Sequence, residues 1–165
     1  MKFNFQSILK SSAAMLLVMT ALSGCSSLKT YPDNSYKNLT VKTSTSSDSI
    51  VQDVNVYLHI YTLDKQCKTD YLGTVNLDKP VKKIGLPVNK NLYIDFAFVR
   101  EGFFSQSSSR ISAETLITPR KGYLYEADAY YENNIYDVTI TQKKSAGAKA
   151  KKFKKLPYEN CKPVK

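Results

Sequence analysis

Eight short segments of strand-forming residues follow one another along the chain, and they constrain its fold more than any other feature. Each is rich in β-branched or aromatic residues and is bounded by Ser, Asn, Asp, Pro or Gly, which favour turns. The segments are 39–43, 53–63, 71–77, 80–86, 91–99, 111–118, 123–131 and 135–142. None of them has convincing helical periodicity. The pattern predicts an all-β chain that forms an antiparallel β-sandwich of seven or eight strands, immunoglobulin-like or transthyretin-like, rather than a closed barrel.

Side-chain alternation within these segments predicts which face of each strand is buried. In segment 53–63, apolar residues occupy every second position and a polar and aromatic set occupies the others, namely Asn55, Tyr57, His59 and Tyr61. Segment 91–99 is apolar on both faces apart from Asp95, so we expect it to be a central strand. Segment 80–86 begins with Pro80 and carries two lysines, which suits an edge strand.

The start of the chain is typical of an exported protein. Lys2 and Lys10 precede an apolar run at 13–22, which is followed by small residues. The run is too short to span a bilayer, which takes about 20 apolar residues, and the polar sequence after it prevents its extension. Residues 1–24 are therefore predicted to be a signal peptide that ends immediately before Cys25.

Leu22-Ser23-Gly24-Cys25 closely resembles the lipobox of bacterial lipoproteins. The resemblance implies that the mature chain begins at Cys25, with diacylglycerol on its sulfur and a further acyl chain, such as palmitate, on its amine. Ser26 in place of aspartate resembles the sorting signal for the outer membrane. The expected location is the outer membrane, with the domain facing the periplasm. The alternative is an ordinary signal peptide followed by a cysteine that is there by chance.

Cysteine count and compartment together predict one disulfide. If Cys25 is acylated, Cys67 and Cys161 remain, and an even number of cysteines in an oxidising compartment favours a bridge. Closing a loop of about 94 residues would contribute about 4.6 kcal/mol in the chain-entropy model. Two free thiols, or a bridge to another molecule, are the alternatives.

Charge is distributed unevenly and divides the chain. Basic and acidic residues balance over 26–140, whereas 141–165 holds nine lysines and one acid, Glu159. We therefore expect a lipidated cysteine and tether at 25–38, a nearly neutral sandwich at 39–142 and a Lys-rich tail at 143–165. If Cys161 is bonded to Cys67, the tail is strapped across the domain at the end that holds residues 64–70.

Residues that could carry out catalysis are few and scattered. His59 is the only histidine, and a lone histidine among strand tyrosines is usually a packed residue rather than a base or a metal ligand. The serines at 105–109 lack a nucleophile motif. The sequence shows no metal-ligand spacing and no motif for a cofactor or nucleotide. Paired carboxylates of a glycosidase are conceivable among Glu114, Glu126, Asp128 and Asp137.

Two stretches are candidates for binding. Phe103 and Phe104 lie beside Gly102 in a predicted loop, where they would either form an exposed apolar anchor or fold back over the core. The tail would either adhere to anionic lipid, lipopolysaccharide or an acidic protein, or form an inert soluble end. Its binding candidates are Lys151, Lys152, Lys154 and Lys155. Nucleic acid is not an expected partner in this compartment.

These features favour a non-catalytic, membrane-anchored binding or assembly module with a protein partner in the cell envelope. Size, anchor and predicted fold resemble the small transthyretin-like lipoprotein of the type VI secretion apparatus, but no motif beyond the lipobox carries that resemblance. The alternative is an inhibitor or immunity-type lipoprotein that blocks an envelope hydrolase. An enzyme is the least favoured interpretation, because it would depend on carboxylates that the sequence does not bring together.

Overall fold

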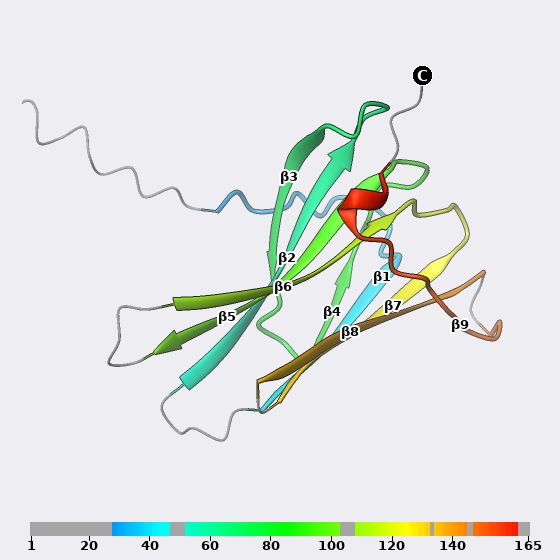
Figure 1. Cartoon of the computed structure of the whole chain (residues 1–165). Helices are drawn as coiled ribbons and strands as arrows, with labels where there is room; N and C mark the ends of the chain where they lie inside the picture. Colours follow the sequence, from blue (N-terminus) through cyan, green and yellow to red (C-terminus); the bar gives the residue numbers. More distant parts are fainter. Residues whose placement is uncertain (1–27, 47–51, 103–107, 133, 145–146, 162–165) are drawn as a thin grey trace, which may run out of the picture.

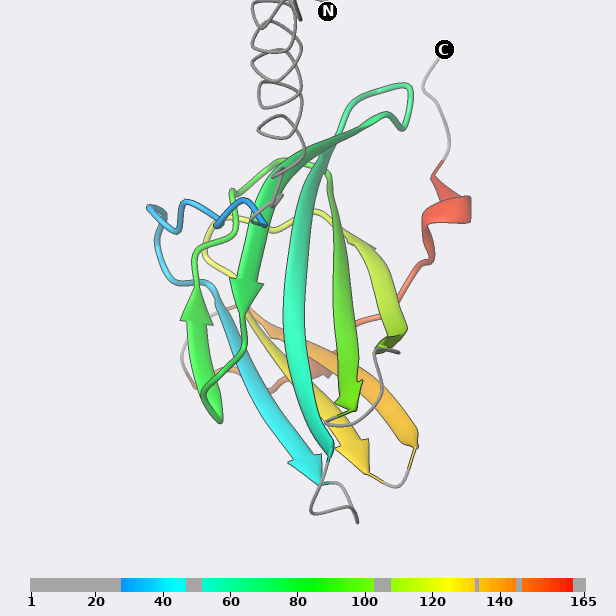
Figure 2. The same ribbon diagram turned by 90° about the vertical axis from the view of Figure 1, so that its left-hand side faces the viewer.

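The computed structural model describes residues 28–46, 52–102, 108–132, 134–144 and 147–161. Two β-sheets lie face to face with the core between them (Figures 1 and 2). The four-stranded sheet has the order β3 (Thr69–Asn76), β2 (Gln52–Leu63), β5 (Leu92–Gly102) and β6 (Ser108–Ile117). The five-stranded sheet has the order β4 (Val81–Ile84), β1 (Leu39–Ser46), β7 (Leu124–Glu132), β8 (Ile135–Lys143) and β9 (Lys151–Lys152).

The predicted all-β sandwich is confirmed, and each of the eight predicted segments overlaps one of the strands β1 to β8. The two-residue strand β9 was not predicted, because its lysines carry no strand signal and pair only through the backbone of β8. A three-residue 3-10 turn, η2 (Tyr158–Asn160), follows it. The edge position predicted for segment 80–86 is confirmed by β4, and the central position predicted for segment 91–99 by β5, which lies between β2 and β6.

The strand order differs from that of the constant-type immunoglobulin sandwich. In the constant-type immunoglobulin sandwich, the first, second, fourth and fifth strands share one sheet. Here β1 and β4 lie in one sheet, whereas β2 and β5 lie in the other. The order therefore excludes the constant-type immunoglobulin arrangement. The strand pairs are antiparallel as predicted, with one exception: β1 and β7 run parallel over eight residue pairs.

The core follows from alternation on the two inner faces. Strand β5 contributes Leu92, Ile94, Phe96 and Phe98, all fully buried, and the facing sheet supplies residues such as Val41 and Ile140. Because successive side chains point to opposite faces, the intervening residues of β5 stand on the outer face of the four-stranded sheet. Asp95 is thereby placed on that outer face, between His59 of β2 and Glu114 of β6.

The N-terminal segment, residues 28–38, which is part of the predicted tether, is fixed to the sandwich near its start. Thr74 N–H donates to the carbonyl of Lys29 at 2.7 Å, and Tyr31 N–H donates to the carbonyl of Thr74 at 2.9 Å. The Tyr31 ring is buried and its hydroxyl donates to the carbonyl of Gly85 at 2.7 Å. The polar composition of residues 28–38 did not indicate these contacts, because the backbone makes most of them.

Gly73 explains why the N-terminal segment can approach β3 so closely. It has a φ of 147° and lies in a bulge, where β2 and β3 shift register between Ile60 and Tyr61. A Cβ at Gly73 would lie 2.6 Å from the backbone of Tyr31. Any other residue at this position would push the N-terminal segment away from the sheet edge.

The C-terminal strap, which we define as residues 147–161, crosses from the five-stranded sheet to the four-stranded one (Figure 1). Phe153 N–H donates to the carbonyl of Ile140 in β8 at 2.7 Å, and Leu116 N–H of β6 donates to the carbonyl of Leu156 at 2.7 Å. A disulfide then joins Cys161 to Cys67, with the two Cα atoms 6.0 Å apart. The predicted disulfide and the strapped form of the tail are thus confirmed.

Candidate functional site

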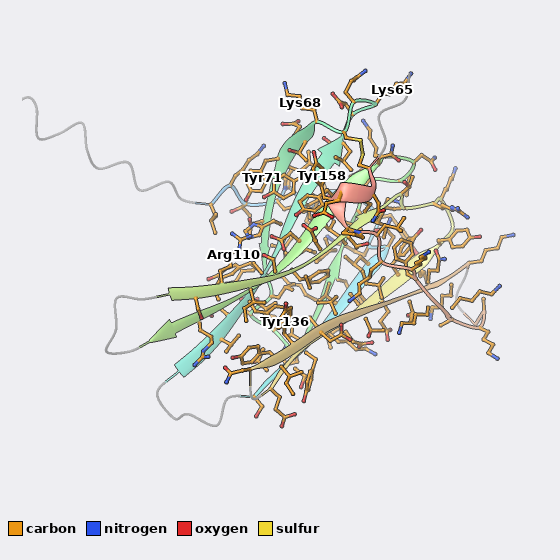
Figure 3. All side chains as sticks on the ribbon, viewed as in Figure 1. Lys65, Lys68, Tyr71, Arg110, Tyr136 and Tyr158 are labelled. Atoms are coloured by element: carbon orange, nitrogen blue, oxygen red, sulfur yellow. A yellow bond between two sulfur atoms is a disulfide. The ribbon has the colours of Figure 1, made fainter. Side chains whose placement is uncertain are left out.

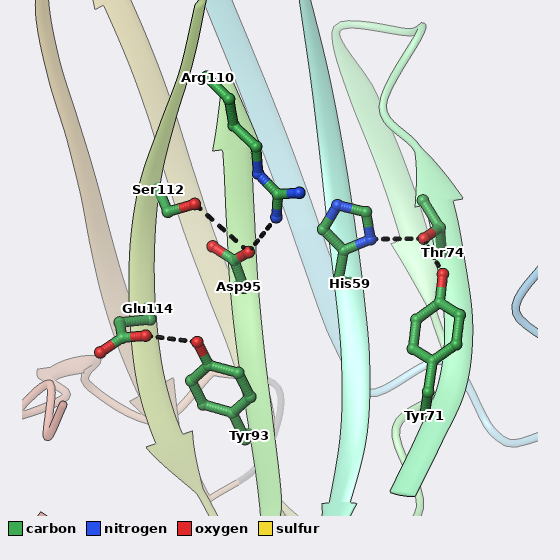
Figure 4. Close-up of polar contacts among 8 residues, drawn as sticks. All are labelled: His59, Tyr71, Thr74, Tyr93, Asp95, Arg110, Ser112 and Glu114. Carbon is green, nitrogen blue, oxygen red and sulfur yellow. Dashed lines mark hydrogen bonds and ion pairs between the residues drawn. The ribbon is translucent and has the colours of Figure 1, made fainter. Parts of the chain in front are cut away.

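A row of tyrosine rings crosses the outer face of the four-stranded sheet. Tyr71 of β3, Tyr61 of β2, Tyr93 of β5 and Tyr158 of the strap follow one another with ring centroids 5.0, 5.3 and 5.3 Å apart. The first three are half-buried and Tyr158 is exposed. We call this outer face the tyrosine face. It comprises Tyr61 and the eight residues drawn in Figure 4, namely His59, Tyr71, Thr74, Tyr93, Asp95, Arg110, Ser112 and Glu114.

His59 is held in a short hydrogen-bonded chain beside the tyrosine row. Its Nδ1 lies 2.5 Å from the hydroxyl of Thr74, which also contacts the hydroxyl of Tyr71. Both His59 and Thr74 are only about 5–6% exposed. Burial, and then the nearby positive charge of Arg110, lower the pKa of His59, and Asp95 only partly offsets them. The imidazole is therefore neutral at pH 7, and the Thr74 hydroxyl bridges the His59 Nδ1 and the Tyr71 hydroxyl.

Asp95 is a buried carboxylate at the middle of the tyrosine face. Its side chain is 7% exposed, and its Oδ2 accepts a charge-assisted hydrogen bond from Arg110 at 2.6 Å and a long one from Ser112 at 3.4 Å. Its other oxygen, Oδ1, is buried without a hydrogen-bond partner in the described part of the chain. A buried acceptor without a partner is unfavourable by about 1–3 kcal/mol, so this oxygen needs an explanation.

Glu114 joins the strap to the tyrosine face. Its Oε2 accepts the hydroxyl of Tyr93, and its Oε1 accepts the backbone N–H of Tyr158 at 3.4 Å. Burial, followed by the hydrogen bond to Glu114, raises the pKa of Tyr93 well above its ordinary value of 10.0. Burial likewise raises the pKa of Tyr61. Both phenols therefore stay protonated and act as donors at neutral pH.

Arranged in this way, these groups suit binding better than nucleophilic catalysis. Thr74, the hydroxyl nearest to His59, is buried and already shared with Tyr71, so it cannot approach a substrate. In contrast, the tyrosine rings and Arg110, whose side chain is 51% exposed, are presented at the surface. Tyrosine and arginine are the residue types that contribute most to protein–protein binding energy.

Of the four carboxylates that might have paired for catalysis, Glu114 lies in a different sheet from the other three. Glu114 lies in the four-stranded sheet, whereas Glu126, Asp128 and Asp137 lie in the five-stranded one. Glu126 pairs with Lys42 at 2.7 Å, and Asp137 pairs with Lys155 at 3.1 Å. These are the exposed lysine partners expected of acids on strands. This separation rules out a carboxylate pair that includes Glu114.

Among the residues predicted to anchor or bind, the structure describes only the tail lysines. Cys25, Phe103 and Phe104 lie outside the described residues. Lys151, Lys152 and Lys154 are exposed on the strap, and they form no ion pair within the described part of the chain. Lys155 pairs with Asp137 and is therefore partly neutralised. Their role in binding stays a prediction.

In the sequence, Asp95 is noticeable only as the one acid in the otherwise apolar segment 91–99, although it is central to the site. The signal that could have found it is a single carboxylate within an otherwise apolar central strand, because a buried charge needs a specific partner. That partner, Arg110, could not be predicted. It lies just outside the predicted segment 111–118, but β6 begins at Ser108 and so carries Arg110 onto the same face.

One cavity of about 370 Å³ lies between the N-terminal segment and β3. Its walls are largely apolar and include Leu28, Tyr31, Tyr57 and Val75, with Lys82 at one side. In size it matches the lower range of small-ligand sites, and its lining fits a small apolar group rather than a charged cofactor. Among the described residues, no cluster of three or more His, Cys, Asp or Glu side chains could hold a metal ion.

Within the described residues, no helix is long and apolar enough to cross a bilayer. Comparison with known proteins gave no match to a family model, to a curated protein or to a solved structure.

Proposed function

We propose that this chain is an envelope lipoprotein, anchored through acylated Cys25 in the outer membrane and facing the periplasm, which acts as a non-catalytic binding or assembly module. The lipobox residues Leu22-Ser23-Gly24-Cys25 support the anchor. Several acyl chains on one residue hold a protein stably on a bilayer, whereas one chain does so only marginally. The partner is an envelope protein that binds the tyrosine face.

The observation that carries the binding proposal is the buried, half-satisfied carboxylate of Asp95 beneath exposed Arg110. Replacing a buried ion pair by apolar residues is often neutral or stabilising, so such a pair is not needed for folding. Here it fixes the guanidinium of Arg110 beside the tyrosine row, with the Nη2 atom 2.6 Å from Asp95. A pre-oriented arginine among half-buried tyrosines loses little entropy when a partner binds.

Site-specific photocrosslinking in intact cells tests the binding face. A photoreactive residue at Tyr61, on the tyrosine face, is expected to capture a discrete envelope protein. The same residue at Thr139, which lies on the outer face of the other sheet, is the matched control and should capture little. Equal capture at both positions, or capture only at Thr139, would contradict the proposal. Capture of a single cell-wall hydrolase would favour the inhibitor alternative over assembly.

Intact mass and fractionation test the anchor separately. The mature chain should begin at Cys25 and carry three acyl chains, and Cys25→Ser should move the protein from the membrane to the soluble fraction. Retention of Cys25→Ser on membranes in high salt would refute the lipid anchor. This result is independent of the crosslinking pattern.

A further inference from the structure

The N-terminal segment leaves almost no slack between the proposed lipid and the folded domain. The backbone is fixed to β3 at Lys29 and Tyr31 by two hydrogen bonds of 2.7 and 2.9 Å. Three peptide links separate Leu28 from Cys25, and they can span at most about 10 Å. An anchor on Cys25 would therefore hold the domain at the bilayer surface rather than at the end of a long tether.

The direction of the N-terminal segment identifies the end of the sandwich that faces the membrane. Thr30 and Thr74 form a parallel bridge, so the chain from Thr30 back to Leu28 runs toward Thr69, the start of β3. That end holds the turn between β2 and β3, which we call the β2–β3 turn and define as residues 64–68. The hairpin tip between β7 and β8 lies at the opposite end of the sandwich (Figures 1 and 2).

The β2–β3 turn is rigid and presents two lysines. The Asp64 carboxylate accepts the backbone N–H groups of Gln66 and Lys68, both at 2.8 Å. Cys67 is bonded to Cys161, and its carbonyl accepts the hydroxyl of Tyr158 at 2.5 Å. The side chains of Lys65 and Lys68 point away from the sandwich at this end (Figure 3). Both are exposed, and neither forms an ion pair within the described residues.

We propose that the β2–β3 turn rests on the anionic phospholipid headgroups of the membrane that carries the anchor, with Lys65 and Lys68 as the contacting cations. This inference rests on the proposed lipid anchor, because the anchor brings this end to the bilayer. The Asp64 carboxylate is turned toward backbone donors within the turn, whereas the ammonium groups of Lys65 and Lys68 point outward, toward the lipid phosphates. Each lysine close to an anionic surface strengthens binding about fivefold.

The orientation has a consequence for the partner. Strand β5 has 11 residues, so it extends about 36 Å from the membrane end to the far end. With the β2–β3 turn on the headgroups, the tyrosine face stands roughly upright on the bilayer. A partner that binds this face would then approach parallel to the membrane, as another protein held in the same membrane does.

Tryptophan quenching tests the orientation directly, because the natural chain contains no tryptophan. Gln66→Trp places the reporter in the β2–β3 turn, and Ile135→Trp places a matched, exposed reporter at the far end. The lipidated protein is reconstituted in phosphatidylglycerol-containing vesicles with a nitroxide on lipid headgroups. Strong quenching is expected at residue 66 and little at residue 135. Equal quenching, or stronger quenching at 135, would overturn the proposal.

Lysine variants test the headgroup contact. Lys65→Gln/Lys68→Gln should reduce the quenching of the residue-66 reporter in anionic vesicles and leave it unchanged in neutral ones, where quenching is weaker from the start. In the lipid-free chain, the same change should weaken binding to anionic vesicles roughly 25-fold. Lys151→Gln/Lys152→Gln, on the strap, tests the competing contact, and an equal or larger loss there would assign the contact to the strap instead.

Separate measurements test the proposal of the anchor and the proposal of the orientation. Vesicle flotation of the lipidated protein reports the anchor, whereas quenching at residue 66 reports the orientation. Flotation without quenching at residue 66 would overturn the headgroup contact and leave the lipoprotein proposal intact. Absence of acyl chains by intact mass would overturn the lipoprotein proposal, and binding of the lipid-free chain to anionic vesicles would still test the two lysines.

Discussion

The outer faces of the two sheets are built from the same alternation, but they differ in what they bury. On the tyrosine face, three polar side chains are almost fully buried, namely His59, Thr74 and Asp95. On the outer face of the five-stranded sheet, polar side chains remain in contact with water. We call it the threonine face and define it by Thr40, Lys42, Glu126, Asp128, Thr139 and Thr141.

Aromatic neighbours account for the difference. The rings of Tyr61, Tyr71 and Tyr93 stand over the strands and exclude water from the polar groups between them. The six residues that define the threonine face include no aromatic ring and hold one cross-strand ion pair, whose charges stay solvated. A buried polar group needs a specific partner, whereas a solvated one does not. The tyrosine face therefore holds polar groups in specific buried interactions, whereas the polar groups of the threonine face remain solvated.

Loss of the disulfide should have the largest effect, and it should act mainly on the tyrosine face. The double variant Cys67→Ser/Cys161→Ser is expected to lower the free energy of unfolding by about 4 kcal/mol, because it releases a loop that spans 94 residues. Urea unfolding measures the loss. Because the strap contacts Leu116 through the backbone and Glu114 through Tyr158, hydrogen exchange should quicken most at β6.

Exchange in β1 and β7, which form the threonine face, provides the control for this variant. Amide protection in β1 and β7 should fall only by the amount that the loss of global stability accounts for. Uniform loss of protection in both sheets, with no additional loss at β6, would show that the strap does not act on one face alone.

Removal of Arg110 should be the next largest effect. Arg110→Met leaves the Asp95 carboxylate buried without its cation, and we expect a loss of about 2 kcal/mol in the free energy of unfolding. The loss is smaller than for a fully buried pair because Arg110 is half exposed. Adding Asp95→Val should restore stability, since an apolar β-branched residue suits a central strand.

The rescued double variant separates stability from binding. It should fold as well as the natural chain yet capture less partner through a photoreactive residue at Tyr61. Failure of Asp95→Val to restore stability would mean that the buried ion pair stabilises the fold, and it would remove the argument that the pair is retained for binding.

His59 should make stability depend on pH. Its folded pKa lies below its ordinary value of 6.5, so the unfolded chain binds more protons in this range. Stability is therefore fully present above about pH 6.5 and falls as the pH drops toward the folded pKa, by at most about 1.4 kcal/mol per pH unit. Urea unfolding between about pH 5.5 and 7.5 measures the slope, and His59→Gln should flatten it.

Much of this architecture could be predicted from the sequence, because alternation and turn residues act locally. The pattern in segment 53–63 places His59 on the outer face, as observed, and Pro80 marks the edge strand. The parallel pairing of β1 with β7 joins segments that are far apart in the sequence and leaves no local signal. The docking of residues 29–31 depends on backbone hydrogen bonds and on the missing side chain of Gly73.

The site itself was predictable only in part, for the same reason. The cysteine pair and the outward lysines follow from residue type and compartment. The link between Asp95 and Arg110 joins neighbouring strands at a register that depends on where β6 begins. The tyrosine row adds Tyr158 from the strap, whose position is set by the disulfide and by Leu156 rather than by any periodicity.

The smallest effect should come from the threonine face. Lys42 and Glu126 form an exposed pair at 2.7 Å, and the variant Glu126→Gln is expected to change the free energy of unfolding by only about 0.2–1 kcal/mol. Since both partners are solvated, added salt should remove most of even this difference. A loss as large as that of Arg110→Met would show that the two faces are energetically alike, and the assignment of specific interactions to the tyrosine face would then be wrong.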